Sequence, residues 1–280
     1  MTAFRAESAR LAEQRVRRFR ADFGIHYAPV DCFRLVRELS DSGKFPVEYE
    51  TARLQNPGWD GKTHYLKEIR TFYIAIRRPA PDWKKRSAAR RCNFSMAHEL
   101  GHIFCGHLLV PDALKSKATE AAEEAEADAF AAALLMPPEI LAQFSSVTEA
   151  ADALWVSESA VLHRLAETGI RFTGRACPRC GRCPLAPAAR FCPQCGLQLQ
   201  PGPNPDTPPE IVWIPPAEET CIACGSRKLP FPDGTCPHCD MPRRNHCLPE
   251  YDLPQHSAPA DALYCPLCGA ETLFRAYLST

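Results

Sequence analysis

The 280-residue sequence lacks an excess of charge of either sign, because 33 lysines and arginines balance 33 aspartates and glutamates. This balance gives no electrostatic argument for nucleic acid or a membrane as the main partner. Long apolar runs are also missing, since the longest, residues 129–136, is far below the roughly 20 residues that span a bilayer. The arginine-rich residues 1–24 contain no apolar core of the signal-peptide kind. We therefore expect a cytoplasmic protein without a membrane partner.

Cysteine is scarce in the first 170 residues, where only Cys32, Cys92 and Cys105 occur, whereas twelve cysteines lie between Cys177 and Cys268. In the reducing compartment expected for this chain, clustered thiols favour metal binding over disulfides. The sequence thus divides into a globular front and a tail rich in cysteine and proline.

The front shows the apolar spacing, turn residues and caps of a mixed fold. An N-terminal helix and a short helix after Pro29 come first. Strands are predicted at 44–50, 63–68 and 70–76, and helices at 87–109, 119–136 and, as a pair, within 147–168. The strands favour a small antiparallel sheet, so the fold class predicted for the front is α+β.

The pentapeptide HELGH at residues 98–102 is the strongest chemical signal in the front. On a helix, His98 and His102 project from one face and can bind one zinc ion through neutral imidazoles. Zinc activates water and polarises a carbonyl, and Glu99 is placed to take a proton and later return it to the leaving amine. Gly101 is costly inside a helix and suits a close approach by a neighbouring backbone. The motif predicts a zinc-dependent hydrolase with Glu99 as catalytic base.

A third zinc ligand is expected on the next helix, where four glutamates compete: Glu120, Glu123, Glu124 and Glu126. Glu126 shares its stripe with Phe130 and Leu134, which is typical of a core-facing row. Glu124 is followed one turn later by Asp128, which could accept a hydrogen bond from the free ring nitrogen of a zinc-bound histidine. We assign Glu124 to zinc and Asp128 to the support of a ligand, with Glu126 as the rival.

The segment RRCNFSMAHELGHIFCGH, followed by EAEADAFAAALLMP, resembles the ImmA/IrrE family of zinc metallopeptidases over about residues 25–170. The resemblance implies a zincin-like fold of the gluzincin type, with His98, His102 and Glu124 as ligands and Glu99 as base. It further implies site-specific cleavage of a helix-turn-helix repressor, which derepresses mobile-element or stress genes. The donor that assists zinc in the transition state stays open among four residues, His26, Tyr65, Tyr73 and His107.

Residues 148–168 have the apolar spacing of a helix-turn-helix, in which Ser157 would cap the second helix. Only His163 and Arg164 on that helix could reach DNA, so we favour ordinary packing. The alternative function is a zinc-stabilised DNA- or protein-binding transcription regulator whose peptidase-like domain is not proteolytic.

The tail repeats CxxC knuckles, and two such pairs complete a tetrahedral four-cysteine zinc site. The knuckles resemble those of double zinc ribbons. Cys183 has no obvious partner, and Cys247 with His246 or His256 could complete the last knuckle. The predicted sites are Cys177/Cys180/Cys192/Cys195, Cys221/Cys224/Cys236/Cys239, and a third with Cys247/Cys265/Cys268.

The predicted organisation is a peptidase domain followed by ribbons whose zinc is structural. The cofactors expected are one catalytic and two or three structural zinc ions. The expected boundaries are 1–170 for the peptidase domain, 175–200 for ribbon 1, 201–216 for a proline-rich linker, 217–242 for ribbon 2, and 243–280 for a third knuckle region.

Overall fold

A computed structural model of the chain describes residues 3–54, 58–78, 85–172, 174–200, 211–213, 221, 235–236, 239–241, 244–248 and 255–279. The chain separates into two compact units. Unit 1 comprises Met1–Pro138 and Leu154–Gly169, and unit 2 comprises Glu139–Ala153 and Ile170–Thr280. The domain boundaries given above stay a prediction, and nearly all of the predicted linker 201–216 lies outside the described residues.

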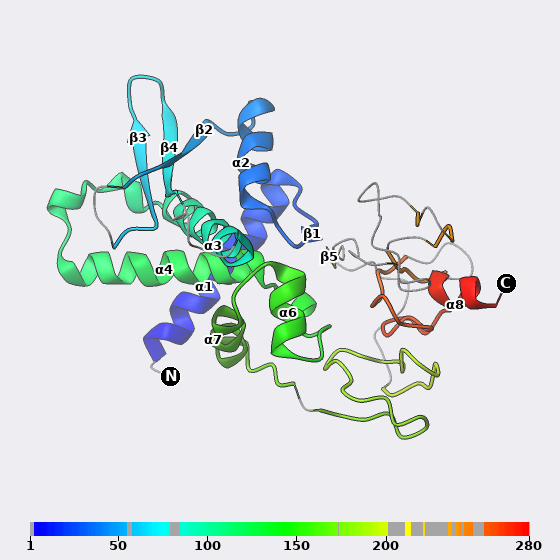
Figure 1. Cartoon of the computed structure of the whole chain (residues 1–280). Helices are drawn as coiled ribbons and strands as arrows, with labels where there is room; N and C mark the ends of the chain where they lie inside the picture. Colours follow the sequence, from blue (N-terminus) through cyan, green and yellow to red (C-terminus); the bar gives the residue numbers. More distant parts are fainter. Residues whose placement is uncertain are drawn as a thin grey trace. The chain divides into compact units, whose positions relative to one another are not determined.

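Unit 1 holds the long helices, which run from blue to green in Figure 1. The predicted helix pair appears as α6 (Val147–Leu154) and α7 (Glu158–Thr168), with Ser157 capping α7 and Gly169 ending it at a φ of 72°. The elements of unit 1 are α1 (Ala3–Phe23), β1 (Tyr27–Ala28), α2 (Cys32–Asp41), β2 (Val47–Ala52), β3 (Gly61–Leu66), β4 (Thr71–Arg77), α3 (Lys85–Phe104), η1 (His107–Leu109), η2 (Asp112–Leu114), α4 (Lys117–Leu135) and α7 (Glu158–Thr168).

The three-stranded sheet confirms the α+β class but is mixed. β3 and β4 pair antiparallel, whereas β2 runs parallel to β4, and the strand order is β2-β4-β3. The expectation of a wholly antiparallel sheet was therefore wrong. The reason is that β3 does not pair with β2, which precedes it in the chain. β4 follows β3 and lies between the two, paired with both. This order leaves β3 at an edge of the sheet.

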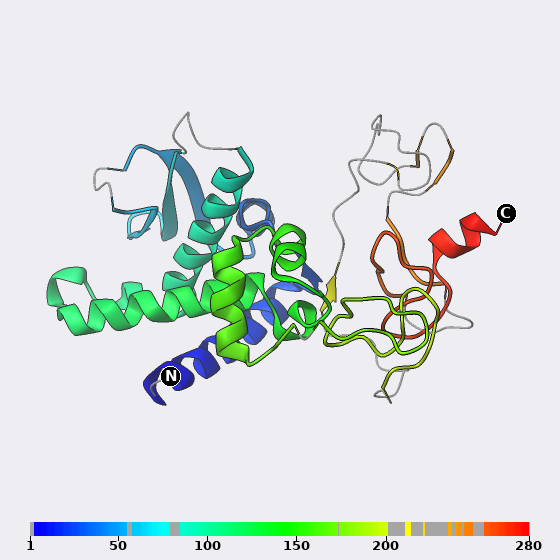
Figure 2. The same cartoon turned by 60° about the horizontal axis from the view of Figure 1, so that its bottom comes forward.

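Helix α3 packs against β3 and β4 on one side and against α4 on the other (Figures 1 and 2). At Gly101 the helices are so close that an added Cβ would meet the Cα and carbonyl oxygen of Ala127 at 3.0 Å. The close approach expected at Gly101 is thus confirmed, and its partner is the backbone of α4. Helices α1, α3 and α4 also contribute to an aromatic cluster, which is formed by Phe19, Phe23, Phe45, Phe104 and Phe130.

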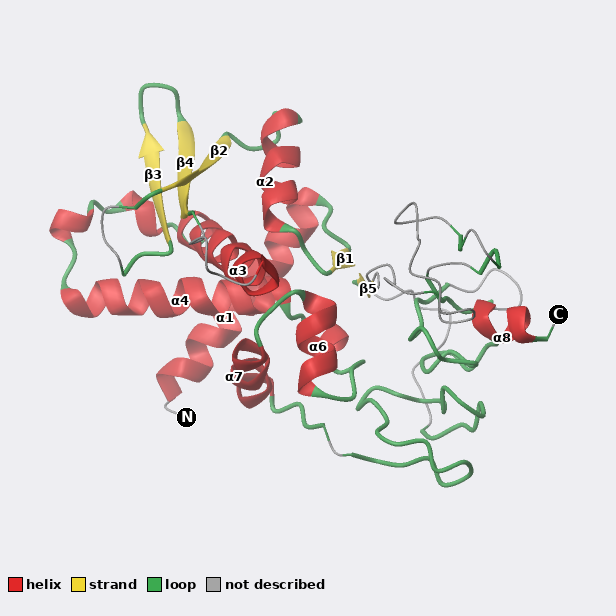
Figure 3. Cartoon of the chain, viewed as in Figure 1, coloured by secondary structure: helices red, strands yellow, loops and turns green. Residues whose placement is uncertain are grey.

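Unit 2 consists mainly of loops, which are green in Figure 3. Its regular elements are α6 (Val147–Leu154, except its last residue), β5 (Val212–Trp213) and α8 (Leu273–Leu278), while α5 (Pro138–Leu141) spans the boundary with unit 1. Cysteines form part of its buried clusters, as where Cys177 and Cys192 pack with Leu185. Across both units, the described helices include none long and apolar enough to cross a membrane.

Two knuckles of unit 2 pack on each other reciprocally. The amides of Arg190 and Phe191 donate to Pro266 O, while those of Leu263 and Tyr264 donate to Pro193 O. The ring before each knuckle also covers the glycine that ends the other, since a Cβ on Gly269 would meet Phe191 at 2.7 Å and one on Gly196 would meet Tyr264 at 3.0 Å. Residues 190–196 and 263–269 therefore form a single pseudo-symmetric body, which we call the knuckle pair.

Candidate active site

Three predicted ligands converge on one point of unit 1. The Nε2 atoms of His98 and His102, one turn apart on α3, lie 3.0 Å from each other. Glu124 reaches over from α4, with its carboxylate oxygens 3.3 Å from His98 Nε2 and 3.5 Å from His102 Nε2. Of the four competing glutamates, Glu124 is the one placed beside both histidines.

This group fits a zinc ion by its donors and by its spacing. Two imidazole nitrogens and a carboxylate are a ligand set found in catalytic zinc sites, and two nitrogens on one tetrahedral zinc stand about 3.3 Å apart. The ligand atoms of His98, His102 and Glu124 all lie within 4.8 Å of one another. The three residues could therefore hold one cation and leave a coordination position open.

The second nitrogen of each histidine is also occupied. His98 Nδ1 lies 2.8 Å from Asp128 Oδ1, the carboxylate expected in this supporting role. His102 Nδ1 lies 3.0 Å from Nδ1 of a third histidine, His107. Such outer contacts fix the ring orientation and tautomer of a ligating histidine. Both rings are thus presented through Nε2.

The electrostatics of the two histidines differ. Burial and the neighbouring His98 lower the pKa of His102 to about 4, so this imidazole is neutral as a metal requires. Burial also disfavours the charged form of His98, but hydrogen bonds with Asp128 and Glu124 outweigh it and raise its pKa to about 10. A cation at this site therefore has to displace a proton that the two carboxylates hold on His98.

Glu99 lies beside the ligands and is 5% exposed. Its Oε2 accepts a hydrogen bond of 2.6 Å from Thr63 Oγ1 of β3. Burial raises the pKa of Glu99, an effect that the Thr63 hydroxyl and His98 partly oppose. Gly61 makes room for the carboxylate, since a Cβ there would lie 2.5 Å from Glu99 Oε1. Glu99 is thus a fixed carboxylate with raised proton affinity, as suits a general base.

A cavity of about 890 Å³ opens onto these residues. Its lining includes all three ligands and Glu99, and the start of edge strand β3 forms one wall through Gly61, Lys62 and Thr63. Leu108, next to the exposed Leu109, lies at another part of the lining. The cavity is large enough for several residues of an extended peptide beside His98, His102 and Glu124.

Two of the competing glutamates, Glu123 and Glu126, have other partners, whereas Glu120 lines the cavity. Glu126 forms ion pairs with Arg15 of α1 and with His107, whose Nε2 lies 2.9 Å from Glu126 Oε2. Glu123 pairs with Lys115 at 2.8 Å. Glu126 therefore faces away from the two HELGH histidines, towards the interior between α1 and α4.

Sequence reasoning missed the role of His107, which it named only as one of four candidate donors to the transition state. His107 is 5% exposed and contacts His102 from the side opposite Nε2. No helical period relates the two residues, because the chain leaves α3 after Phe104 and turns back at Gly106, whose φ is 79°. The glycine itself was the available signal for that reversal.

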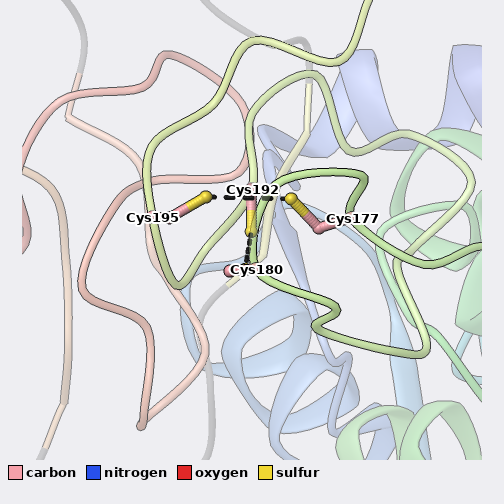
Figure 4. A group of neighbouring side chains, drawn as sticks. All are labelled: Cys177, Cys180, Cys192 and Cys195. Carbon is pink, nitrogen blue, oxygen red and sulfur yellow. Dashed lines mark hydrogen bonds between the residues drawn. The ribbon is translucent and has the colours of Figure 1, made fainter.

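In the tail, the first four predicted cysteines come together (Figure 4). Cys177 Sγ lies 3.7 Å from Cys195 Sγ, and Cys180 Sγ lies 3.5 Å from Cys192 Sγ. Two sulfurs on one tetrahedral zinc stand about 3.8 Å apart, which matches these values. The amide of Cys180 stabilises the thiolate of Cys177 and lowers its pKa to about 6. These residues suit a structural four-cysteine site.

Two further groups of possible metal ligands lie in the tail. Cys221, Cys236 and Cys239 lie together, whereas Cys224 lies outside the described residues. Cys247, Cys265 and Cys268 lie together with His256. Of the two histidines considered for this cluster, His256 and not His246 is therefore the one beside the cysteines. Cys183 is exposed and its Sγ contacts Gly174 O, so it stands apart from the first cluster. Such clusters are compatible with zinc ribbons.

The helix pair does not present its basic residues in the manner of a DNA reader. Arg164 of α7 is 2% exposed, donates to Met136 O at 3.1 Å, and forms an ion pair with Glu13 of α1. Only His163 of the two residues considered for DNA contact is exposed. Arg164 thus anchors α7 to the rest of unit 1.

The fold and the site define an α+β protein whose front carries a two-histidine, one-carboxylate centre beside a buried glutamate. Residues 84–166 match the family model Peptidase_M78, the IrrE N-terminal-like domain, which confirms the family resemblance over that segment. Comparison with curated proteins gives no match. A solved Mycobacterium tuberculosis transcriptional regulator is similar at 18% identity and a TM-score of 0.37, over 57% of this chain and 47% of that one. The chain thus spans about half the length of that regulator.

Proposed function

We propose that the protein is a zinc-dependent metallo-endopeptidase that cleaves a helix-turn-helix transcriptional repressor and so derepresses mobile-element or stress genes. The observation that carries the proposal is the convergence of His98, His102 and Glu124 in one cavity beside buried Glu99. The match of residues 84–166 to a peptidase family supports the same activity.

The residues of the chain divide the chemistry between them. His98, His102 and Glu124 would hold the zinc, which when bound supplies Lewis acidity towards a carbonyl and water. Glu99 takes the proton of the attacking water and delivers it to the leaving amine. Thr63 holds the Glu99 carboxylate in place through the 2.6 Å hydrogen bond. Asp128 keeps the His98 ring turned with Nε2 towards the ligand group.

An extended peptide is the substrate form that the site accommodates. β3 pairs only with β4 among the described strands, so its other edge offers backbone donors and acceptors to an added strand. Its first residues, Gly61, Lys62 and Thr63, line the cavity next to Glu99. A peptide paired with this edge would bring a backbone carbonyl to the ligand group. This geometry supports endopeptidase activity on an internal, unfolded segment.

The choice of a repressor as substrate rests on the family resemblance of the two motifs rather than on a contact. The tail would hold two or three structural zinc ions and serve as a protein-binding arm. DNA binding through α7 is disfavoured because Arg164 is buried against Met136 O and Glu13. A protein substrate therefore accounts for more of the observed geometry than a DNA site.

The test coexpresses the full chain, or its Glu99→Gln variant, with the helix-turn-helix repressor encoded nearest to it. Glutamine keeps the size of the side chain and can still accept from Thr63, but it cannot act as a base. We expect the repressor to be cut by the wild type alone, at a rate at least about 100-fold above the variant. Cleavage by both forms would refute the role of Glu99, and an intact repressor with both would refute the substrate.

A further inference from the structure

His102 is supported from behind by a row of three side chains from three other elements. His107 of η1 lies with its Nδ1 3.0 Å from His102 Nδ1 and its Nε2 2.9 Å from Glu126 Oε2 of α4. Glu126 in turn forms an ion pair with Arg15 of α1. His107 is 5% exposed, and its backbone carbonyl accepts from Lys115 Nζ at 2.8 Å. Solvent therefore has little access to either ring nitrogen.

Only one arrangement of protons satisfies this row when His102 binds a cation. With Nε2 occupied, the proton of neutral His102 resides on Nδ1, which must donate to His107 Nδ1. His107 then carries its own proton on Nε2 and donates it to Glu126. The negative charge of Glu126 is balanced by Arg15. Each donor of the row then has an acceptor.

We propose that His107 is a positioning residue that fixes the tautomer and orientation of His102 for metal binding, and that Glu126 and Arg15 hold His107 in the required tautomer. The inference rests on the proposed function, because it presumes a cation at His98, His102 and Glu124. His107 does for His102 what Asp128 does for His98, without adding another negative charge.

A second metal site is the competing interpretation, since Cys105, His107 and Glu126 offer ligand atoms within 4.8 Å of one another. The guanidinium of Arg15 argues against it, because it bonds both Glu126 and Cys105 and would repel a cation there. Burial raises the pKa of the Cys105 thiol, which disfavours the thiolate that a metal requires. Both nitrogens of His107 are also already engaged.

Two amide substitutions separate the two sides of His107. In His107→Asn the amide oxygen can take the place of Nδ1 and still accept from His102. In His107→Gln the amide group takes the place of Nε2 and loses that contact. Both residues are uncharged and differ by one methylene, so a mere packing role would not favour asparagine. Glu126→Ala provides a further variant that leaves His107 in place but removes its acceptor.

The measurement is the zinc affinity of the full chain in competition with a chelator, with His98→Ala identifying the ion that depends on the HELGH helix. Loss of an outer partner of a zinc ligand costs about 10–100-fold in affinity, so we expect that loss for His107→Gln, a value within about threefold of wild type for His107→Asn, and an intermediate loss for Glu126→Ala. Circular dichroism checks that each variant is folded.

Equal losses in the asparagine and glutamine variants would overturn the inference, as would wild-type affinity in both. An additional zinc lost with His107 but kept in His98→Ala would replace it with the second metal site. If the His107 variants fail to fold, wild-type affinity in Glu126→Ala also overturns it. If no zinc depends on His98, the proposed function fails with the inference, whereas a His98-dependent zinc indifferent to His107 and Glu126 refutes the inference alone.

Discussion

The two units of the chain are stabilised by different means. Unit 1 buries large apolar side chains, among them Phe130, Ile74, Met96 and Leu134, at a relative exposure of zero. In unit 2 the small clusters are built around the thiols themselves, as with Cys221 and Cys236 beside Met241. Segments so short cannot bury enough apolar area to offset their loss of conformational entropy. A metal bound by these cysteines would therefore contribute to the folding free energy of unit 2, whereas a metal bound at His98, His102 and Glu124 would enter a site that unit 1 has already folded.

Removal of zinc should break this comparison most clearly. With a strong chelator, we expect unit 2 to lose its tertiary structure, because structural zinc contributes about 10–16 kcal/mol in small zinc-binding peptides. The helices α1, α3 and α4 of unit 1 should keep their slow amide exchange. Hydrogen exchange resolved by segment measures both. Parallel loss of protection in α4 and in the ribbons would show that unit 1 also depends on metal.

A smaller effect is expected from Cys265→Ser, which removes one thiol of the third cluster. Because residues 263–269 pack reciprocally on residues 190–196, we also expect zinc to leave the Cys177 cluster about tenfold faster, as for contacting groups coupled by 1–2 kcal/mol. The rate of zinc transfer to a chelator measures this. Cys183→Ser is the matched control and should change nothing, since Cys183 lies outside the cluster. Unaltered release from the Cys177 cluster would mean that the knuckles act independently.

The smallest structural effect, and a local one, is expected from Gly61→Ala. The new Cβ would lie 2.5 Å from Glu99 Oε1, so the carboxylate must move away from its place beside Thr63. We expect kcat to fall about 10–100-fold, up to the lower limit of the roughly 100- to 10,000-fold attributed to a general base, because the displaced carboxylate remains near the site. Zinc content and the unfolding temperature should stay near wild type. Peptide cleavage assays measure the fall in kcat, and metal analysis measures the zinc content. Loss of zinc together with activity would place the damage at the ligands instead.

The sequence predicts those parts of the molecule that local periodicity encodes. His98, Glu99 and His102 are fixed relative to one another by the helix, and Glu124 with Asp128 repeats a one-turn spacing on α4. The glycines and capping residues likewise predict the ends of α7, at Ser157 and Gly169. These features depend on neighbours in the sequence, which is why they are accessible without a structure.

Contacts between distant segments were less predictable. The parallel pairing of β2 with β4 depends on where β3 lies, and alternation of side chains along a strand carries no information on its direction. Arginines are expected at the surface, yet Arg20 and Arg164 are buried. Both donate to carbonyl oxygens at the end of α4, Arg20 to Leu134 O and Arg164 to Met136 O. His107 reaches His102 only because Gly106 reverses the chain.

The assignment of residues 139–153 to unit 2 has a practical meaning for anyone who wishes to shorten the protein. Within unit 2, the ring of Phe144 meets Trp213 edge-on at 5.2 Å, and the amide of Ala188 donates to Ala142 O at 2.8 Å. A chain cut after Gly169 would retain Phe144 and Ala142 but not these partners. It would carry a fresh apolar surface prone to self-association. Unit 1 is therefore better studied in a chain whose tail cysteines are substituted than in one from which the tail is deleted.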